Sequence, residues 1–160
     1  MIKELTINRA KWLLPNTSNE DSCLLADDGK MCCLGMFAKQ SGLKPKLIAE
    51  AASLSHLADS TARTAASFTR FSDKFGLFLC DTSAIANNSG YSDSVVGKNL
   101  MAINDCGVGL NFNYCYKNGI EKLHILKSQK HREELLTKEF AKVGVAVSFI
   151  NELDLLDDEE

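Results

Sequence analysis

The sequence lacks the features that mark a membrane, secreted or nucleic-acid-binding protein. No apolar run approaches the roughly 18 residues of a membrane helix, and the first residues have no apolar signal-peptide core. The 160 residues carry 18 basic and 21 acidic side chains, a net charge of −3, so the basic excess typical of nonspecific nucleic-acid binding is absent. Hydrophobic residues make up 45%, as in ordinary globular chains. We expect a cytoplasmic protein without a membrane segment.

Complete catalytic and cofactor motifs are missing as well. Six residues separate Gly90 from Gly97, where a phosphate-binding loop has four. The segment around Gly107 and Gly109 lacks the third glycine of a dinucleotide site and does not open a helix. No Cys-x-x-Cys or His-x-x-x-His pair occurs, so zinc has little support. The sequence therefore predicts no cofactor and no metal.

The charge is concentrated at the C-terminal end. Residues 152–160 contain six acidic side chains and no basic one, which leaves +3 on residues 1–151. Such a run is usually a solvated tail that aids solubility, or else it attracts a basic surface of a partner. We therefore divide the chain into one domain, 1–151, and an acidic tail, 152–160. The tail residues with a candidate binding role are Asp157, Asp158, Glu159 and Glu160.

Hydrophobic periodicity predicts an α+β fold. Alternation over residues 3–8 and 145–150 is typical of strands, and helical spacing dominates between them. We expect a small antiparallel or mixed sheet of about four strands, packed against four or five helices. The expected helices are residues 31–38 with an end near Gly42; a segment from Pro45 with Leu47, Ile48, Ala51, Leu54 and Ala58; a segment with Phe68, Phe71, Phe75 and Phe78; one capped by Ser92 with Val96, Leu100 and Ile103; and one capped by Ser128 with Leu135, Leu136, Phe140 and Val143 that ends at Gly144.

Residues 110–125 carry the clearest local pattern. Apolar and polar side chains alternate on both sides of Asn118-Gly119, the preferred two-residue turn of a hairpin. A two-residue turn pairs residue 114 with 123 and residue 112 with 125. The apolar face then holds Phe112, Tyr114, Leu123 and Ile125, and the polar face holds Asn113, Cys115, Lys122 and His124.

Two adjacent cysteines are the most reactive candidates in the sequence. Cys32 and Cys33 fall in the first turn of an expected helix, where free amides and the helix dipole can lower a thiol pKa. A cysteine nucleophile also needs a base, for which His124 is a candidate, with Asp105 to orient a histidine. The alternative is that both thiols are small core residues, since free cysteine is among the most buried residue types. The six cysteines are expected to be reduced in the cytosol.

Four short blocks carry a resemblance to known proteins. They are Leu5–Leu13, Gly29–Gly35 with its Cys-Leu-Gly, Leu100–Asp105 with its Asn-Asp, and Phe140–Phe149. Together, over about a quarter of the chain, they resemble small uncharacterised phage and prophage proteins with the same segments and a terminal helix-Gly-strand. The resemblance implies a phage or mobile-element setting and no particular activity.

Three functions remain open at this level. The leading hypothesis is a non-enzymatic protein that binds and inhibits or modulates a host protein, with Tyr114 and Tyr116 or the acidic tail at the interface. The second is a small enzyme that uses Cys32 or Cys33 as nucleophile. The third is a nucleic-acid-binding module that uses the basic residues around the hairpin, namely Lys122, Lys127, Lys130 and Arg132.

Overall fold

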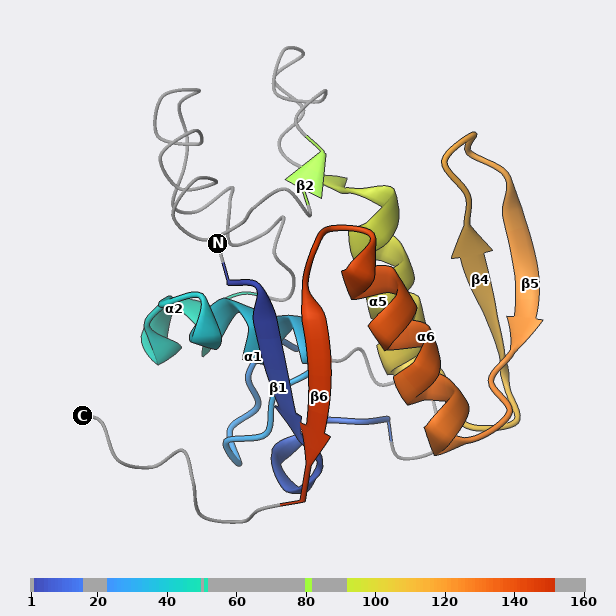
Figure 1. The fold of residues 1–160 in the computed structure, drawn as a ribbon. Helices are drawn as coiled ribbons and strands as arrows, with labels where there is room; N and C mark the ends of the chain where they lie inside the picture. Colours follow the sequence, from blue (N-terminus) through green and yellow to red (C-terminus); the bar gives the residue numbers. More distant parts are fainter. Residues whose placement is uncertain (1, 16–22, 50, 52–79, 82–91, 152–160) are drawn as a thin grey trace.

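The computed structural model of the chain describes residues 2–15, 23–49, 51, 80–81 and 92–151 (Figure 1). It is a mixed α and β structure, as the hydrophobic pattern predicts. The expected helix around Phe68, Phe71, Phe75 and Phe78 lies outside these residues, and so does the acidic tail.

The first and last strands of the described chain lie side by side (Figure 1). Strand β1 (Glu4–Asn8) pairs in parallel with β6 (Ala146–Ile150), and both strands were expected from the sequence. Leu5 and Ile7 of β1 are fully buried because they point toward the helices, while Thr6 faces the other side. A 3-10 turn, η1 (Arg9–Lys11), follows β1, and the Asn8 side chain accepts a hydrogen bond from its Ala10 amide.

The described residues include four α-helices, of which α1 packs on β1 and α6 on β6. Three of them, α1, α5 and α6, form the core, and α2 continues from α1. Helix α5 begins after Ser94 rather than the expected Ser92, because the Ser94 hydroxyl accepts a hydrogen bond from the amide of Gly97. Ser128 caps α6 as expected. The bounds are α1 (Cys33–Gln40), α2 (Pro45–Ala49), α5 (Val95–Asp105) and α6 (Gln129–Ala141).

Helix α1 is buried along most of its length, and one glycine makes this possible. A Cβ atom on Gly35 would lie 1.8 Å from the carbonyl oxygen of Leu24, so only glycine lets that backbone pass. Phe37 of α1 then packs against Phe140 of α6, with ring centroids 5.9 Å apart. The Cys-Leu-Gly segment therefore has a packing role in this fold.

The strands do not form the single sheet of about four strands that the sequence suggested. In the described part of the chain they form three separate pairs: β1 with β6, β2 (Cys80–Asp81) with β3 (Ser92–Asp93), and β4 (Asn111–Cys115) with β5 (Glu121–Ile125). Helices α5 and α6 separate the first pair from the last, because both pack between them (Figure 1). The helices thus prevent the two pairs from joining.

The expected hairpin forms, but its expected register is wrong by one residue. Tyr114 lies opposite Lys122 and Phe112 opposite His124, because three residues form the turn instead of two. The Tyr116 amide donates to the Ile120 carbonyl, and Gly119 adopts a positive φ of 76°, as in a three-residue hairpin loop. A shift of one residue moves every side chain of a strand to the opposite face. Leu123 and Ile125 therefore leave the face that holds Phe112 and Tyr114.

Two strand edges in the core are closed by side-chain amides. Gln40 of α1 accepts from the Thr6 amide at 3.0 Å and donates to the Thr6 carbonyl at 2.7 Å. Asn99 of α5 does the same for Cys115 of β4, at 2.7 and 2.9 Å. Each carboxamide takes the place of one peptide group of a neighbouring strand, so another strand could not pair at Thr6 or at Cys115 without displacing it.

Candidate functional site

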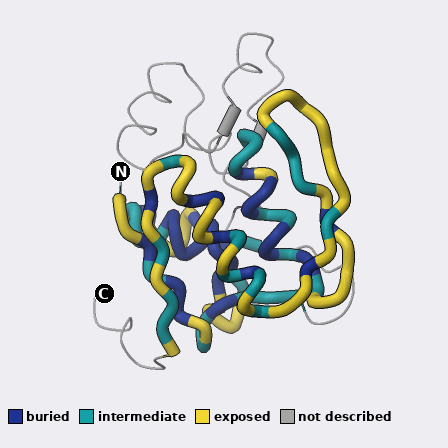
Figure 2. The backbone as a smooth tube through the Cα atoms, turned by 45° about the vertical axis from the view of Figure 1, so that its right-hand side comes forward, coloured by how far each residue is buried: buried dark blue, intermediate teal, exposed yellow. Residues whose placement is uncertain are grey.

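Hairpin β4–β5 presents two different faces. The inner face looks toward α5 and α6 and holds Phe112, Tyr114, Tyr116, Lys122 and His124. The outer face holds Asn111, Asn113, Cys115, Glu121, Leu123 and Ile125. Figure 2 shows exposed residues along β5, whereas β4 alternates between buried or intermediate and exposed positions.

The outer face exposes large apolar side chains. Leu123 is 67% exposed and Ile125 is 56% exposed, and they are neighbours along β5 because they are two residues apart on one strand. Contiguous exposed apolar groups of this kind are typical of interaction surfaces.

Strand β5 also has an open backbone edge in the described structure. Backbone hydrogen bonds join residue 116 to 120 and residue 126 to 110, so even-numbered residues bond across the hairpin. The amides and carbonyls of Glu121, Leu123 and Ile125 therefore point away from β4. No described strand pairs with that side of β5. The exposed apolar side chains thus flank unpaired backbone groups.

The hairpin segment is basic overall. Residues 106–131 contain four lysines and one glutamate, which gives +3 with neutral histidines. Lys117, Lys122, Lys127 and Lys130 are all exposed. This charge is local, since the whole chain carries −3. An acidic partner is therefore favoured at this end of the molecule.

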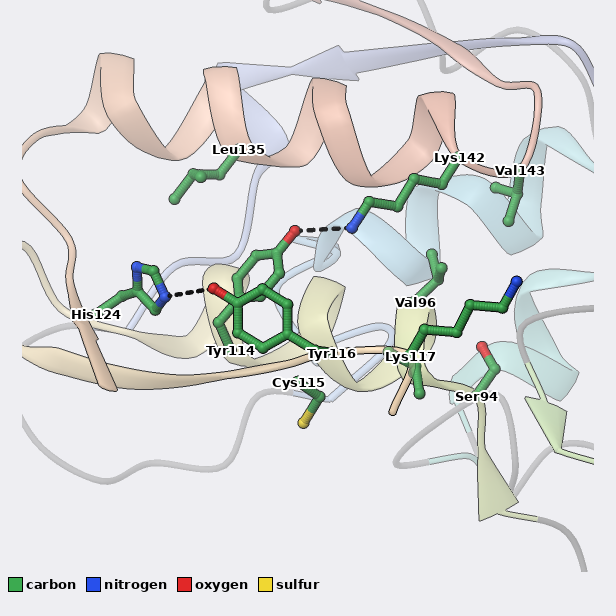
Figure 3. Close-up of a pocket in the computed structure, with 11 residues that line it drawn as sticks. Ser94, Val96, Tyr114, Cys115, Tyr116, Lys117, His124, Leu135, Lys142 and Val143 are labelled. Carbon is green, nitrogen blue, oxygen red and sulfur yellow. Dashed lines mark hydrogen bonds between the residues drawn. The ribbon is translucent and has the colours of Figure 1, made fainter. Parts of the chain in front are cut away.

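The inner face borders a cavity of about 780 Å³ (Figure 3). Tyr114, Tyr116 and His124 form its hairpin wall, and the other lining residues include aliphatic groups of α5 and α6 as well as the polar Ser94, Lys117 and Lys142. The Tyr114 ring centroid lies 5.5 Å from that of Tyr116 and 5.4 Å from that of His124. Both tyrosines are half-buried here, so they do not form the exposed anchor that the sequence suggested.

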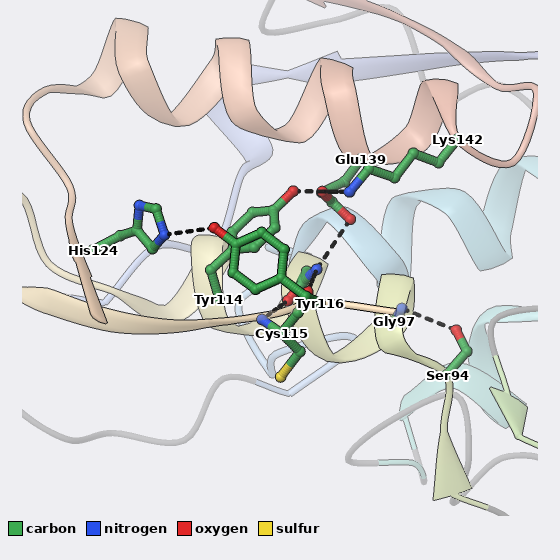
Figure 4. A network of polar contacts seen from close by, with 9 residues as sticks. Ser94, Gly97, Tyr114, Cys115, Tyr116, His124, Glu139 and Lys142 are labelled. Carbon is green, nitrogen blue, oxygen red and sulfur yellow. Dashed lines mark hydrogen bonds and ion pairs between the residues drawn. The ribbon is translucent and has the colours of Figure 1, made fainter. Parts of the chain in front are cut away.

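A polar network lies behind this wall (Figure 4). The fully buried carboxylate of Glu139 pairs with the Lys142 ammonium and accepts from the Asn99 amide at 3.3 Å. The same ammonium donates to the Tyr114 hydroxyl at 3.0 Å. The Tyr116 hydroxyl lies 3.3 Å from His124 Nε2. Both oxygens of the buried carboxylate are thus occupied, and the tyrosine hydroxyls are held in place.

The two adjacent cysteines are core residues. Cys32 is the residue before α1, and its Sγ accepts from the Gly35 amide at 3.4 Å. Burial raises the pKa of the Cys32 thiol to about 12, opposite to the lowering expected at a helix start. Cys33 is fully buried, and burial raises its thiol pKa well above the usual value too. The five described cysteine side chains are free thiols.

The residues proposed to assist a cysteine lie elsewhere or act differently. His124 contacts the tyrosines of the hairpin, and neither Cys32 nor Cys33 has a histidine among its hydrogen-bond partners. Asp105 accepts from the Asn104 side chain at 2.9 Å, and its negative charge contributes to raising both thiol pKa values. The geometry therefore does not assemble a nucleophile with its base.

Arg132, expected on a basic nucleic-acid-binding surface, is buried. Its guanidinium donates to the carbonyls of Asn104 and Cys106 at 2.8 and 2.7 Å, which satisfies the C-terminal end of α5. The Asn104 side chain joins further parts of the core, because its Oδ1 accepts from the Trp12 indole at 2.8 Å and from the Cys33 amide at 3.1 Å. The Asn-Asp motif thus ties α5 to α1 and to the segment after β1.

Sequence reasoning missed the strand-closing amides and the buried acid. Gln40, Asn99 and Glu139 read as ordinary polar residues in helices, and nothing in their spacing reveals a partner distant in the chain. The exposure of Leu123 and Ile125 was hidden by the wrong turn length. A turn of three residues with glycine last was the signal that would have corrected the register.

The described residues contain neither a membrane-spanning helix nor a metal-binding cluster. No helix in the described residues is long and apolar enough to cross a membrane. Within the same residues, no group of three His, Cys, Asp or Glu side chains is placed to hold a metal ion. Comparison of the chain with family models, curated proteins and solved structures gives no match.

Proposed function

We propose that this chain is a non-enzymatic protein-binding module whose partner contributes an extended segment that pairs with β5. The observation that carries the proposal is the open edge of β5, where the outward backbone groups of Leu123 and Ile125 meet no described strand and their side chains are more than half exposed. Strand addition uses both features, because the backbone gives affinity and alternate side chains give specificity. Gln40 and Asn99 bond the outward backbone groups of Thr6 in β1 and of Cys115 in β4, whereas no described strand pairs with the outward side of β5.

The chemistry of the surface defines the expected partner segment. It carries apolar side chains at alternate positions to cover Leu123 and Ile125, and acidic residues to meet the exposed lysines. In the phage or mobile-element setting implied by the resemblance, the partner is a host enzyme or defence complex, inhibited or modulated on binding. The acidic tail is a second candidate contact, which deletion of residues 152–160 tests.

A nucleic acid is the alternative ligand for the same basic end. Lys122, Lys127 and Lys130 are exposed there and favour it, whereas the buried Arg132 does not contribute. The cysteine-enzyme alternative requires an accessible thiolate, and burial and raised thiol pKa values oppose one at Cys32 and Cys33. The protein-binding proposal instead relies on groups that are exposed, namely Leu123, Ile125 and the lysines around the hairpin.

The test is a quantitative pull-down from nuclease-treated host lysate, read by mass spectrometry. The tagged wild type is compared with a Leu123→Lys/Ile125→Lys variant and with Glu121→Pro, which removes an outward amide without touching the ladder to β4. Leu47→Lys, at an exposed leucine of α2, and Glu121→Gln are the matched controls. We expect the wild type and both controls to capture one host protein in a fixed ratio to the bait. Both β5 variants are expected not to capture it.

A further measurement on that complex identifies the binding mode. Hydrogen exchange of residues 120–126 is expected to slow when the partner binds, because the outward amides gain acceptors. Equal capture by wild type and both β5 variants contradicts the proposal. Capture that nuclease abolishes favours the nucleic-acid alternative instead.

A further inference from the structure

The cavity beneath the inner face of the hairpin is a second candidate site, independent of the outer face. Its volume of about 780 Å³ is within the range of pockets that hold small molecules, roughly 300–1,000 Å³. The outer face, with Leu123 and Ile125, and this cavity lie on opposite sides of the same two-stranded sheet. The two sites are therefore separable by mutation.

The walls of the cavity favour a flat apolar body. Tyr114, Tyr116 and His124 present a row of neighbouring rings along the hairpin (Figure 3). Val96 of α5, with Leu135 and Val143 of the α6 side, provides aliphatic surface opposite these rings. An aromatic ligand packs well against such surfaces, through offset stacking and dispersion.

The polar groups at the cavity are hydrogen-bond donors with unused capacity. The Tyr114 oxygen accepts from Lys142, so its own hydrogen is free to donate, and it has no acceptor among the described residues. The Lys142 ammonium uses two of its three hydrogens, one on Tyr114 and one on Glu139. Both Glu139 oxygens are already bonded and the residue is fully buried, so this acid offers the cavity no acceptor.

We propose that the cavity binds a small molecule with a flat aromatic body and one acidic, hydrogen-bond-accepting end. The acidic end accepts from the Tyr114 hydroxyl and the Lys142 ammonium, which are 3.0 Å apart and thus reach one anionic group together. The aromatic body lies along the tyrosine and histidine rings, toward Val96. Glu139, which holds Lys142 in place, acts as a positioning residue.

Two fluorescent probes of nearly the same shape test this proposal. Anilinonaphthalene sulfonate has an aromatic body with an acidic end, and phenylnaphthylamine has the body alone. Both are titrated into the full chain. We expect Tyr114→Phe, which keeps the ring and removes the donor, to weaken sulfonate binding about tenfold and to leave the neutral probe unchanged. Thr137→Val is the control, since it removes a hydroxyl of α6 that bonds the Glu133 carbonyl and does not line the cavity, and it is expected to change neither affinity.

Filling the cavity and altering the outer face complete the test. Val96→Trp is expected to abolish binding of both probes, and Val143→Trp fills the space from the other side if the first variant does not fold. Leu123→Ser/Ile125→Ser is expected to leave both affinities unchanged, whether or not the protein partner proposed above exists.

Four results would overturn the proposal. They are the absence of probe binding to the wild type, binding that survives the filled cavity, loss of binding in the outer-face variant, and equal sulfonate affinity in wild type and Tyr114→Phe. The last result would leave an apolar cavity that does not recognise an acid.

Discussion

Strands β1 and β5 have the same length and a similar alternation of apolar residues, yet they end in opposite environments. Leu5 and Ile7 of β1 are fully buried under α1, whereas Leu123 and Ile125 of β5 are more than half exposed. The backbone edge of β1 is closed by Gln40, whereas that of β5 meets no described strand. The difference shows that similar strands can serve the core or remain exposed, and it is the basis of the proposal that β5 docks another molecule.

The largest loss of stability is expected at Gly35 of α1, the helix that covers β1. Gly35→Ala places a Cβ within 1.8 Å of the Leu24 carbonyl oxygen, and backbone on both sides must shift. We expect a loss of more than about 4 kcal/mol in unfolding free energy, or failure to fold, measured by urea denaturation. Gly29→Ala is the control, because its added Cβ meets nothing within 4 Å and only its positive φ of 83° costs about 1–2 kcal/mol. Equal losses in the two variants would contradict the packing role.

Opening the edge of β1 is the next largest change. Gln40→Leu keeps the approximate volume of the side chain but leaves the amide and carbonyl of Thr6 without these partners. We expect a loss of about 2 kcal/mol, from the desolvation of two backbone groups, by urea denaturation. Gln40→Glu keeps an acceptor for the Thr6 amide but has no donor for the Thr6 carbonyl, so it is expected to lose less stability than Gln40→Leu. No loss in Gln40→Leu would mean that the amide does not close this edge.

Alkaline pH is expected to destabilise the core through its buried thiols. The Cys32 thiol ionises near pH 9 when unfolded and near pH 12 when folded, because burial disfavours the thiolate. The unfolded state therefore releases its proton first, and stability is full below pH 9 and falls as the pH rises toward 12. One such thiol lowers the unfolding free energy by up to about 1.4 kcal/mol per pH unit.

Urea denaturation between pH 8 and about pH 10.5 measures this slope. Cys33 acts in the same direction, so Cys32→Ser is expected to reduce the slope and not to remove it. A slope identical in wild type and Cys32→Ser would contradict the burial of this thiol.

The smallest expected effect on stability is at β5. Leu123→Ser and Ile125→Ser change side chains that are mostly in water, so the unfolding free energy is expected to move by less than about 0.5 kcal/mol. Leu5→Ser and Ile7→Ser, at the buried positions of β1, are the matched pair and are expected to lose several kcal/mol, about 2–5 each. Similar losses on both strands would mean that the outer face of β5 is covered.

Sequence reasoning succeeded where the signal is local. The strands at residues 4–8 and 146–150, the Ser128 cap and the hairpin follow from alternation and capping residues a few positions apart. It failed where distant parts of the chain decide the outcome. The charge of Arg132 gives no hint that two carbonyls at the end of α5 enclose it.

The candidate site was predicted only in part. Tyr114 and Tyr116 were identified, but the β5 residues that share their face depend on the turn after Tyr116, where one additional residue exchanges the inner and outer sides of β5. The adjacency of Cys32 and Cys33 indicated reactivity, whereas burial, which depends on the packing of α1 against α5, decided against it. The turn length therefore explains the wrong register of β5, and burial explains why the two cysteines are not the reactive thiols that the sequence suggested.

Residue-resolved amide hydrogen exchange of the free protein, measured by NMR, tests the central claim most directly. The amides of Thr6 and Cys115, bonded to Gln40 and Asn99, are expected to exchange slowly, and so are Lys122 and His124 within the hairpin ladder. Leu123 and Ile125, whose amides point away from β4, are expected to exchange fast. Protection of Leu123 and Ile125 equal to that of Thr6 would show that the edge of β5 is already occupied and would contradict its role as the docking edge.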